Sequence, residues 1–161
     1  MKNILVTGGC GFIGSHVSLE LLKLGYDVTI LDSNINSSES VIEKIRDLSL
    51  KFNSRNIGKL RFVKGDIRDK DLLENVFIKY SLSKSSIDAV VHLAGLKSVK
   101  NSFENPSLYW DVNVRGSISL FNTMIKHKCF VLVFSSSATV YGNPRSIPIF
   151  ENFETKPINP Y

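Results

Sequence analysis

Glycines recur at a regular spacing near the start of the chain, in TGGCGFIG at residues 7–14. Gly9, Gly11 and Gly14 fit the pattern G-x-G-x-x-G, and Gly8, Gly11 and Gly14 fit G-x-x-G-x-x-G. Such glycines allow a tight turn, a close approach of the backbone to a pyrophosphate, and close packing of the following helix. The N-terminus of that helix attracts an anion through its free N–H groups and its dipole. The spacing predicts a dinucleotide site; the alternative is a glycine turn without a ligand.

An acidic residue, Asp32, lies 18 residues after Gly14, at the end of the next apolar run. A carboxylate there can accept hydrogen bonds from both hydroxyls of an adenosine ribose, and it repels a 2′-phosphate. No arginine follows it in residues 33–36. These features favour NAD over NADP, with an ordinary turn aspartate as the alternative.

A second aspartate, Asp66, follows the third apolar run. It could accept a hydrogen bond from an adenine amino group while Ile67 packs on the ring. A turn aspartate before the next helix explains it as well, and both interpretations stay open.

The elements that position these residues alternate along the chain. Continuous apolar runs predict strands at residues 4–7, 28–31, 60–63, 89–93 and 130–134, covered on both faces. Helical periodicity predicts helices at about residues 17–24, 41–52, 69–80 and 106–128. With right-handed crossovers this order predicts an α/β fold, a Rossmann-type doubly wound parallel sheet with strand order 3-2-1-4-5. The ligand crevice is expected between the first and fourth strands.

Local signals mark the ends of the predicted helices. Gly25 is a stop for the first helix, and the serine cluster at residues 37–40 can cap the second. Asp69 is a good N-cap for the third. Pro106 suits the first position of the fourth, whose last turn carries His127.

Composition narrows the class of protein. At 161 residues, with 43% hydrophobic and 22% charged residues, the chain fits one globular domain. The net charge of +5 comes from scattered lysines, which indicate a solvated surface rather than a nucleic-acid partner. No signal peptide and no apolar run of about 20 residues is present, so we expect no membrane association.

Cysteines and histidines indicate neither a disulfide framework nor a metal site. Cys10 and Cys129 are expected to be free thiols in a reducing cytoplasm. His16, His92 and His127 lack the spacing of metal ligands and are interpreted as structural or surface residues.

Residues 142–161 differ from the rest, because they hold four of the five prolines and show no strand or helix pattern. A stretch of this kind in a compact domain is usually functional or frayed. We therefore divide the chain into a nucleotide-binding domain, residues 1–141, and a proline-rich active-site segment, residues 142–161.

Three further segments complete a recognisable set: HLAGLK at residues 92–97, Asn113 in the fourth helix, and SSSATVYG at residues 135–142. With the glycine segment and NPY at residues 159–161, they resemble the extended short-chain dehydrogenase/reductase superfamily. The sequences AGLK and SSSATVYG are similar to those of UDP-glucose 4-epimerases in particular. The resemblance covers the whole chain, which corresponds to somewhat less than half of such an enzyme.

The resemblance implies a role for each matching position. Positions near the cofactor pyrophosphate are Gly8, Gly11, Phe12, Ile13 and Gly14. Those lining the adenosine ribose are Asp32, Ser33, Asn34, Ile35, Asn36 and Ser37, and those at the adenine are Asp66 and Ile67. The nicotinamide side is lined by Leu93, Ala94, Gly95, Leu96, Lys97 and Asn113. The substrate-binding positions are Lys97, Ser137, Ala138 and Thr139, and the catalytic positions are Ser137 and Tyr161.

Each role has a plainer alternative. Lys97 could be a surface lysine, Asn113 could bridge within its helix, and residues 135–137 could be a polar strand exit. The ends of strands at the crevice are where ligand groups belong, which favours a functional role for Ser137.

The implied activity is NAD-dependent epimerisation at C4 of a UDP-hexose, UDP-glucose or UDP-galactose, through a transient 4-keto sugar. Tyr161 would be the base and Ser137 would hydrogen-bond the 4-oxygen. The ordinary tyrosine pKa of about 10 is too high for a base near neutrality. In the family a lysine four residues further on lowers that pKa, and this chain has no such position.

We therefore expect a sheet truncated before its sixth strand, an absent C-terminal substrate domain, and no activity from this chain alone. An open edge and exposed apolar surface should promote self-association. A full-length parent is expected to be a homodimer.

Two other functions stay open. One is another sugar-nucleotide epimerase or a 4,6-dehydratase. Dehydratases carry an Asp-Glu pair after the serine or threonine of this motif, whereas Ala138 and Thr139 stand here, which argues against dehydration. The other is a non-catalytic NAD-binding remnant of a truncated gene.

Overall fold

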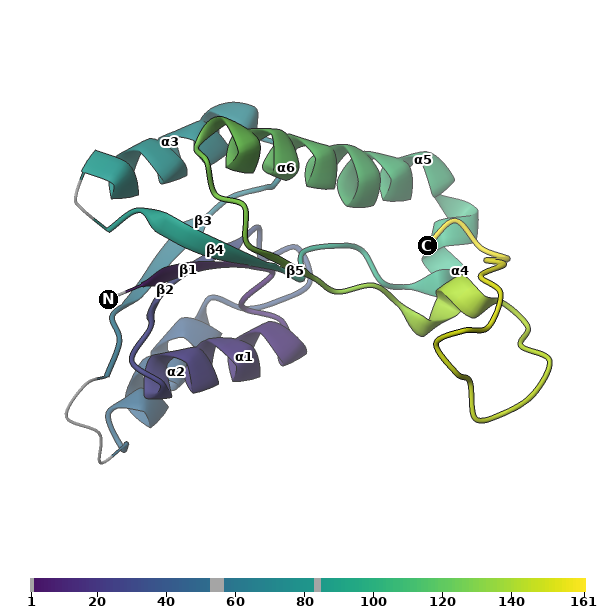
Figure 1. Cartoon of the computed structure of the whole chain (residues 1–161), viewed down its shortest axis with the longest axis horizontal. Coiled ribbons are helices and arrows are strands. Elements are labelled where there is room, and N and C mark those ends of the chain that lie inside the picture. The colour runs from purple at the N-terminus through teal and green to yellow at the C-terminus, as the bar shows by residue number, and fades with distance from the viewer. Residues whose placement is uncertain (1, 53–56, 83–84) are drawn as a thin grey trace.

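A central parallel sheet organises the fold (Figure 1). The computed structural model describes residues 2–52, 57–82 and 85–161. The strands are β1 (Asn3–Thr7), β2 (Asp27–Asp32), β3 (Leu60–Lys64), β4 (Ile87–His92) and β5 (Leu132–Phe134). They pair in parallel in the order β3-β2-β1-β4-β5, which confirms the predicted Rossmann-type topology.

Helices cover both faces of the sheet. Helices α1 (Phe12–Lys23) and α2 (Ser40–Ser49) lie on one face, and α3 (Lys70–Leu82) and α6 (Gly116–Lys126) lie on the other (Figure 1). In β2, Ile30 packs in the core with residues of α1 and α2, whereas its neighbour Leu31 packs with residues of α3 and α6. Burial on both faces explains why β1 and β2 read as continuous apolar runs. The expected cover on both faces is wrong for β5, which is equally apolar but exposed.

The predicted helix ends are largely confirmed. Gly25 follows α1 with φ of +85°, a backbone conformation that glycine adopts without strain. Asp69 accepts a hydrogen bond from the N–H of Leu72 at 2.9 Å, and Pro106 occupies the first turn of α5 (Pro106–Tyr109). The predicted serine cap of α2 is wrong, because Glu39 occupies the N-cap position and its side chain makes no capping hydrogen bond.

The predicted fourth helix is not a single α-helix. It consists of α5, a π-helical turn at Trp110–Arg115, and α6, and it is preceded by an unpredicted short helix, α4 (Val99–Glu104). At the start of α6, a Cβ on Gly116 would lie 2.8 Å from Cδ1 of Ile67. The glycine therefore lets the helix pack closely on the segment that follows β3.

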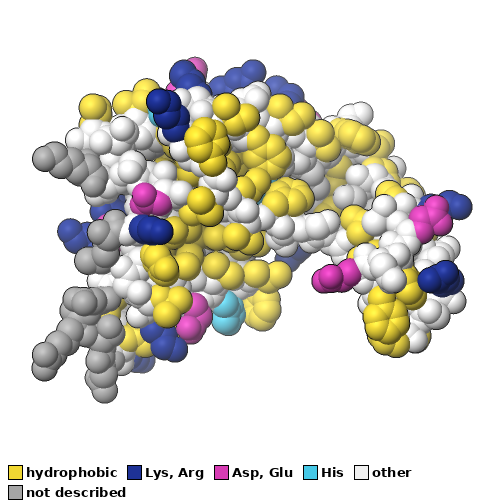
Figure 2. Space-filling view, viewed as in Figure 1, with side chains coloured by type: hydrophobic (Ala, Val, Ile, Leu, Met, Phe, Trp, Pro, Cys, Tyr) yellow, Lys and Arg dark blue, Asp and Glu magenta, His cyan; other side chains and the backbone are white. Residues whose placement is uncertain are grey.

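The region from β5 onward is more open. All three residues of β5 are exposed, and in the described residues the strand pairs only with β4. A short 3-10 helix (Ala138–Tyr141) leads into residues 142–161, which project as a separate lobe and return beside α4 and α5 (Figure 1). Figure 2 shows hydrophobic side chains gathered across the middle of this face. The expected open edge and exposed apolar surface are both present.

Candidate functional site

A cleft of about 420 Å³ lies at the carboxyl ends of the strands. Its walls come from the glycine loop, the ends of β2 and β3, the loop after β4, the helical stretch at residues 112–117, and residues 134–137. This volume falls within the range of about 300–1,000 Å³ typical of small-molecule sites. The cleft therefore lies where a doubly wound sheet binds its ligand.

The glycine loop forms one wall and leaves no room for side chains at two positions. Gly8 has φ of +70°, and a Cβ there would lie 2.7 Å from the backbone nitrogen of Ala94. A Cβ on Gly14 would lie 2.3 Å from the carbonyl oxygen of Gly8. Gly11 is the N-cap of α1 and places no side chain on the helix N-terminus. The glycines therefore present backbone to the space that an anion would occupy, and the exposed side chains of Phe12 and Ile13 line the cleft beside them, as predicted.

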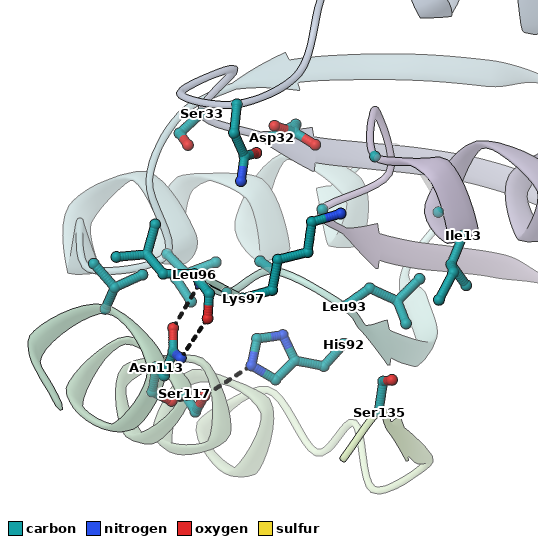
Figure 3. Close-up of a pocket in the computed structure, with 18 of the residues that line it drawn as sticks. Ile13, Asp32, Ser33, His92, Leu93, Leu96, Lys97, Asn113, Ser117 and Ser135 are labelled. Atoms are coloured by element: carbon teal, nitrogen blue, oxygen red, sulfur yellow. Dashed lines mark hydrogen bonds between the residues drawn. The ribbon is translucent and has the colours of Figure 1, made fainter. Parts of the chain in front are cut away.

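Asp32 lines the cleft at the end of β2 (Figure 3). Three hydrogen bonds hold its carboxylate in place. Its Oδ2 accepts from the Cys10 N–H at 2.9 Å, and its Oδ1 accepts at 2.9 Å from both the Asn34 N–H and the Ser37 hydroxyl. A carboxylate offers about four acceptor sites, so one stays available for a ligand hydroxyl. Burial raises the pKa of the Cys10 thiol to about 11, with the Asp32 charge adding to it, so the thiol stays protonated.

Predicted ribose-side residues divide into two groups. Ser33, Ile35 and Asn36 line the cleft. Asn34 and Ser37 lie behind it, where they bind the Asp32 carboxylate. Two of the six predicted positions therefore act on Asp32 rather than facing the cleft.

Asp66 lines the far end of the cleft and is engaged by Arg68. The Arg68 guanidinium binds Asp66 at 3.0 and 2.7 Å and also binds Asp111 at 2.7 Å. The Arg68 guanidinium holds the pKa of Asp66 below its usual range. This network joins the end of β3 to the π-helical turn, while buried Ile67 lines the cleft beside it.

The loop after β4, Leu93–Lys97, forms the floor of the cleft and is bound by Asn113. The Asn113 Oδ1 accepts from the Leu96 N–H at 2.8 Å, and its Nδ2 donates to the Leu96 carbonyl at 2.9 Å (Figure 3). Asn113 therefore bridges to the loop rather than within its own helix. Lys97 is exposed and extends its side chain into the cleft (Figure 3).

The two predicted catalytic residues, Ser137 and Tyr161, both line the end of the cleft beyond β5. The Ser137 Oγ accepts from the backbone N–H of Thr139 at 3.3 Å and from its hydroxyl at 3.0 Å. The ring of Tyr161 packs edge-on against the ring of Tyr109, with 6.4 Å between the ring centroids. Ala138 and Thr139 do not line the cleft, because they turn into the 3-10 helix that Ser137 caps.

Several lining residues were missed from the sequence, among them Val112, Ser117 and His92. Ser117 lies one helical turn after Asn113, and that spacing could have identified it. His92 was interpreted as structural, and it is both buried and at the cleft. Burial lowers the pKa of His92 from 6.5 to about 4.

Residues 2–52, 57–82 and 85–161 contain no group of three or more His, Cys, Asp or Glu side chains that could hold a metal ion. None of their helices is both long and apolar enough to cross a membrane.

Together, the parallel sheet, the glycine loop at a helix N-terminus and the acidic residue ending β2 define a Rossmann-type domain of the extended short-chain dehydrogenase/reductase class. The family model described as GDP-mannose 4,6 dehydratase matches residues 5–161, and the chain belongs to that family.

Proteins similar to the chain are named as UDP-glucose 4-epimerases. The chain is 48% identical, over 99% of its length, to bifunctional UDP-glucose 4-epimerase and UDP-xylose 4-epimerase 1 of Pisum sativum. It is 45% identical, over its full length, to UDP-glucose 4-epimerase 1 of Oryza sativa subsp. japonica. The chain spans 43% of the length of each of these relatives.

Solved structures agree with this likeness. The UDP-glucose 4-epimerase of Stenotrophomonas maltophila, with bound NAD and formylated UDP-arabinopyranose, matches with a TM-score of 0.88 and 42% identity, covering 100% of this chain and 44% of that one. The UDP-glucose 4-epimerase of Bifidobacterium longum, in complex with NAD+ and UDP, matches with a TM-score of 0.87 and 40% identity, covering 99% of this chain and 44% of that one. The predicted resemblance to UDP-glucose 4-epimerases is confirmed.

Proposed function

We propose that this chain is the NAD-binding portion of a UDP-hexose 4-epimerase. Residues 1–141 would bind the cofactor, and residues 142–161 would bring Tyr161 to the sugar. The observation that carries the proposal is one continuous cleft with the glycine loop and Asp32 at one end and Ser137 and Tyr161 at the other.

The residues present fit NAD. The glycine loop offers backbone to a pyrophosphate, because Gly8 and Gly14 exclude side chains there. Asp32 keeps one acceptor site for a ribose hydroxyl, and its charge disfavours the 2′-phosphate of NADP. Ile67 would pack on the adenine, and the Leu93–Lys97 loop would lie beneath the nicotinamide.

The chemistry divides between cofactor and protein. Bound NAD supplies the acceptor and donor of hydride at the sugar C4. Ser137 would hydrogen-bond the 4-oxygen, and Tyr161 would take and return its proton. Lys97, extended into the cleft, would bind hydroxyls of the cofactor or the sugar.

We propose that the chain does not complete this reaction alone. It spans 43% of its relatives' length, and the strand that leads to Ser137 is exposed along its whole length. A turnover assay with UDP-galactose should match a catalyst-free control. Sustained epimerisation by the purified chain would refute this part of the proposal.

The parent assembly and its location are also proposed. Trp110, Val114, Ile118 and Ile125 are exposed at near-helical spacing along the outer side of one helical stretch, which supports a homodimer of the parent. The two buried free thiols support a cytoplasmic location.

Calorimetric titration of NAD and of NADP into the chain tests the cofactor assignment. We expect NAD to bind more tightly than NADP by about tenfold or more, since a hydrogen bond to a charged group contributes roughly 1.5–3 kcal/mol. In Asp32→Asn, which keeps the shape and removes the charge, this preference should largely disappear. Equal affinities in the unmodified chain would contradict the assignment.

The 4,6-dehydratase alternative takes support from the description of the matching family. Ala138 and Thr139 follow Ser137 where dehydratases carry an Asp-Glu pair, and the similar proteins reported above are named epimerases. These two observations favour epimerisation.

A further inference from the structure

His92 lies where three elements meet beneath the cleft. It is the last residue of β4, and it is 2% exposed. Its Nδ1 lies 2.6 Å from the hydroxyl of Thr7, the last residue of β1, and its Nε2 lies 2.8 Å from the hydroxyl of Ser117 in α6 (Figure 3). Both ring nitrogens are therefore engaged within the protein.

The hydrogen bonds on either side of the ring decide where its proton lies. The Thr7 hydroxyl oxygen accepts from the Ala94 N–H at 3.3 Å, and it shares the Leu93 N–H, also at 3.3 Å, with the Thr7 carbonyl oxygen at 3.1 Å, so its own proton points to the His92 Nδ1. On the other side, the Ser117 hydroxyl donates to the Asn113 carbonyl, so its oxygen accepts from Nε2. Both sides require a neutral imidazole with its proton on Nε2.

The surroundings of the ring favour that neutral form. The groups packed against it are the hydroxyls of Thr7 and Ser117 and the rings of Phe121 and Phe134, with centroids at 6.0 and 5.5 Å. All four groups are uncharged, and burial lowers the pKa of the imidazole to about 4. At neutral pH the ring therefore stays uncharged.

The hydrogen-bonded chain through His92 ends on the cleft loop in two places. Through Thr7 it reaches Leu93 and Ala94, and through Ser117 it reaches Asn113, whose side chain binds both backbone groups of Leu96. The Leu93–Lys97 loop is thus held at its start and near its end.

This loop also packs against the glycine loop. A Cβ on Gly8 would lie 2.7 Å from the nitrogen of Ala94 and 2.8 Å from the carbonyl carbon of Leu93. The backbones of the two loops are therefore in contact at Gly8, with no room for a side chain between them.

We propose that His92, as the neutral Nε2–H tautomer, is a positioning residue that holds the Leu93–Lys97 loop against the glycine loop in the arrangement that binds the dinucleotide. The effect on dinucleotide affinity rests on the proposed cofactor function. The tautomer and the order of the loop do not depend on it.

The test uses the whole chain, uniformly labelled with 15N. Long-range 15N–1H correlation of the His92 ring should show a protonated Nε2 and an unprotonated Nδ1 at pH 7. A ring protonated on Nδ1 would overturn the proposal.

Variants test the consequence for the loop. His92→Phe keeps an aromatic ring and removes both hydrogen bonds, so amide exchange at Ala94 and Leu96 should accelerate about tenfold or more while exchange at Ile30 in β2 stays unchanged. NAD affinity should fall about tenfold. His127→Gln is the matched control, because His127 joins α6 to Glu74 of α3, away from the cleft, and it should change neither measurement.

The outcomes separate this proposal from the proposed function. Unchanged loop exchange and NAD affinity in His92→Phe would overturn the positioning role, while NAD binding by the unmodified chain would still support the cofactor. If the unmodified chain binds no NAD, the proposed function fails, and loop exchange and the tautomer still decide the positioning role.

If His92→Phe does not fold, Thr7→Val and Ser117→Ala each remove one end of the chain of bonds. Faster exchange at Ala94 in the first and at Leu96 in the second is then the expected result, and wild-type exchange in both would overturn the proposal.

Discussion

Strands β2 and β5 belong to the same sheet and are built in opposite ways. All six residues of β2 are buried, between two neighbouring strands and beneath helices on both faces. All three residues of β5 are exposed, and one strand pairs with it in the described residues. The end of the sheet that carries Asp32 is a complete core, whereas the end that carries Ser137 is open. We infer that cofactor binding belongs to the first region and can be separated from sugar chemistry in the second.

The largest expected effect is on NAD affinity, when a methyl group is added to a glycine of the first region. The same change at a glycine of the second region provides the comparison. In Gly14→Ala the new Cβ would lie 2.3 Å from the Gly8 carbonyl oxygen, so the loop must rearrange and NAD binding should be lost. In Gly142→Ala, where φ is +58°, the Cβ would lie 2.0 Å from the Lys156 carbonyl oxygen. That variant disturbs only the open region, and its NAD affinity should stay within about twofold of the unmodified chain.

Calorimetry on both variants, with thermal melts to confirm folding, makes this comparison. Equal loss of NAD binding in Gly14→Ala and Gly142→Ala would show that the two regions are not separable.

The next largest effect is a dependence of folding stability on pH, which comes from the buried side chain of His92. Burial lowers the folded-state pKa of His92 to about 4 from its ordinary 6.5, so between these values the unfolded chain binds a proton that the folded chain does not. Stability should therefore be fully present above pH 6.5 and fall by up to about 3 kcal/mol as the pH drops to 4. Asp66 and Asp111, whose pKa values lie below their usual range, add their losses only at lower pH.

Urea unfolding at pH 7 and pH 4.5 measures this effect, and His92→Phe should reduce the difference between the two. An unchanged difference in that variant would show that another group is responsible.

The smallest effect on stability is expected at the open strand. Val133 is 59% exposed on β5, and Val133→Lys should change the free energy of unfolding by no more than about 0.5 kcal/mol. Because a charged edge resists pairing with a second copy, self-association measured by sedimentation should weaken. Ile118→Lys, on the outer side of α6, tests the helical surface proposed for the homodimer. Loss of self-association in that variant alone would place the contact on the helices.

The sequence predicted the cofactor half better than the other half, for physical reasons. The strand order followed from continuous apolar runs, and the glycine loop followed from spacing, because both are local patterns. Whether Asn34 and Ser37 face the cleft or the Asp32 carboxylate depends on the path of one turn, in which Asn34 has φ of +56°. Periodicity does not reveal that path.

The features missed from the sequence depend on contacts between distant segments. The π-helical turn that carries Asn113 differs from an α-helix because its backbone hydrogen bonds span five residues instead of four. The residue types in this turn do not predict that difference. The role of His92 requires Thr7 and Ser117 to meet at one ring, which only the assembled sheet and helix bring about. Thr139 was expected in the cleft, but its backbone N–H and its hydroxyl both donate to the Ser137 Oγ that caps the 3-10 helix.

The separation of the two regions is tested most directly by amide hydrogen exchange of the whole chain with and without saturating NAD. We predict slower exchange at Gly11–Gly14 and at Leu93–Lys97, with little change at Leu132–Phe134 and beyond Gly142. Unchanged exchange in the glycine loop, or slowing confined to β5 and the segment after it, would show that the cofactor does not bind in the first region.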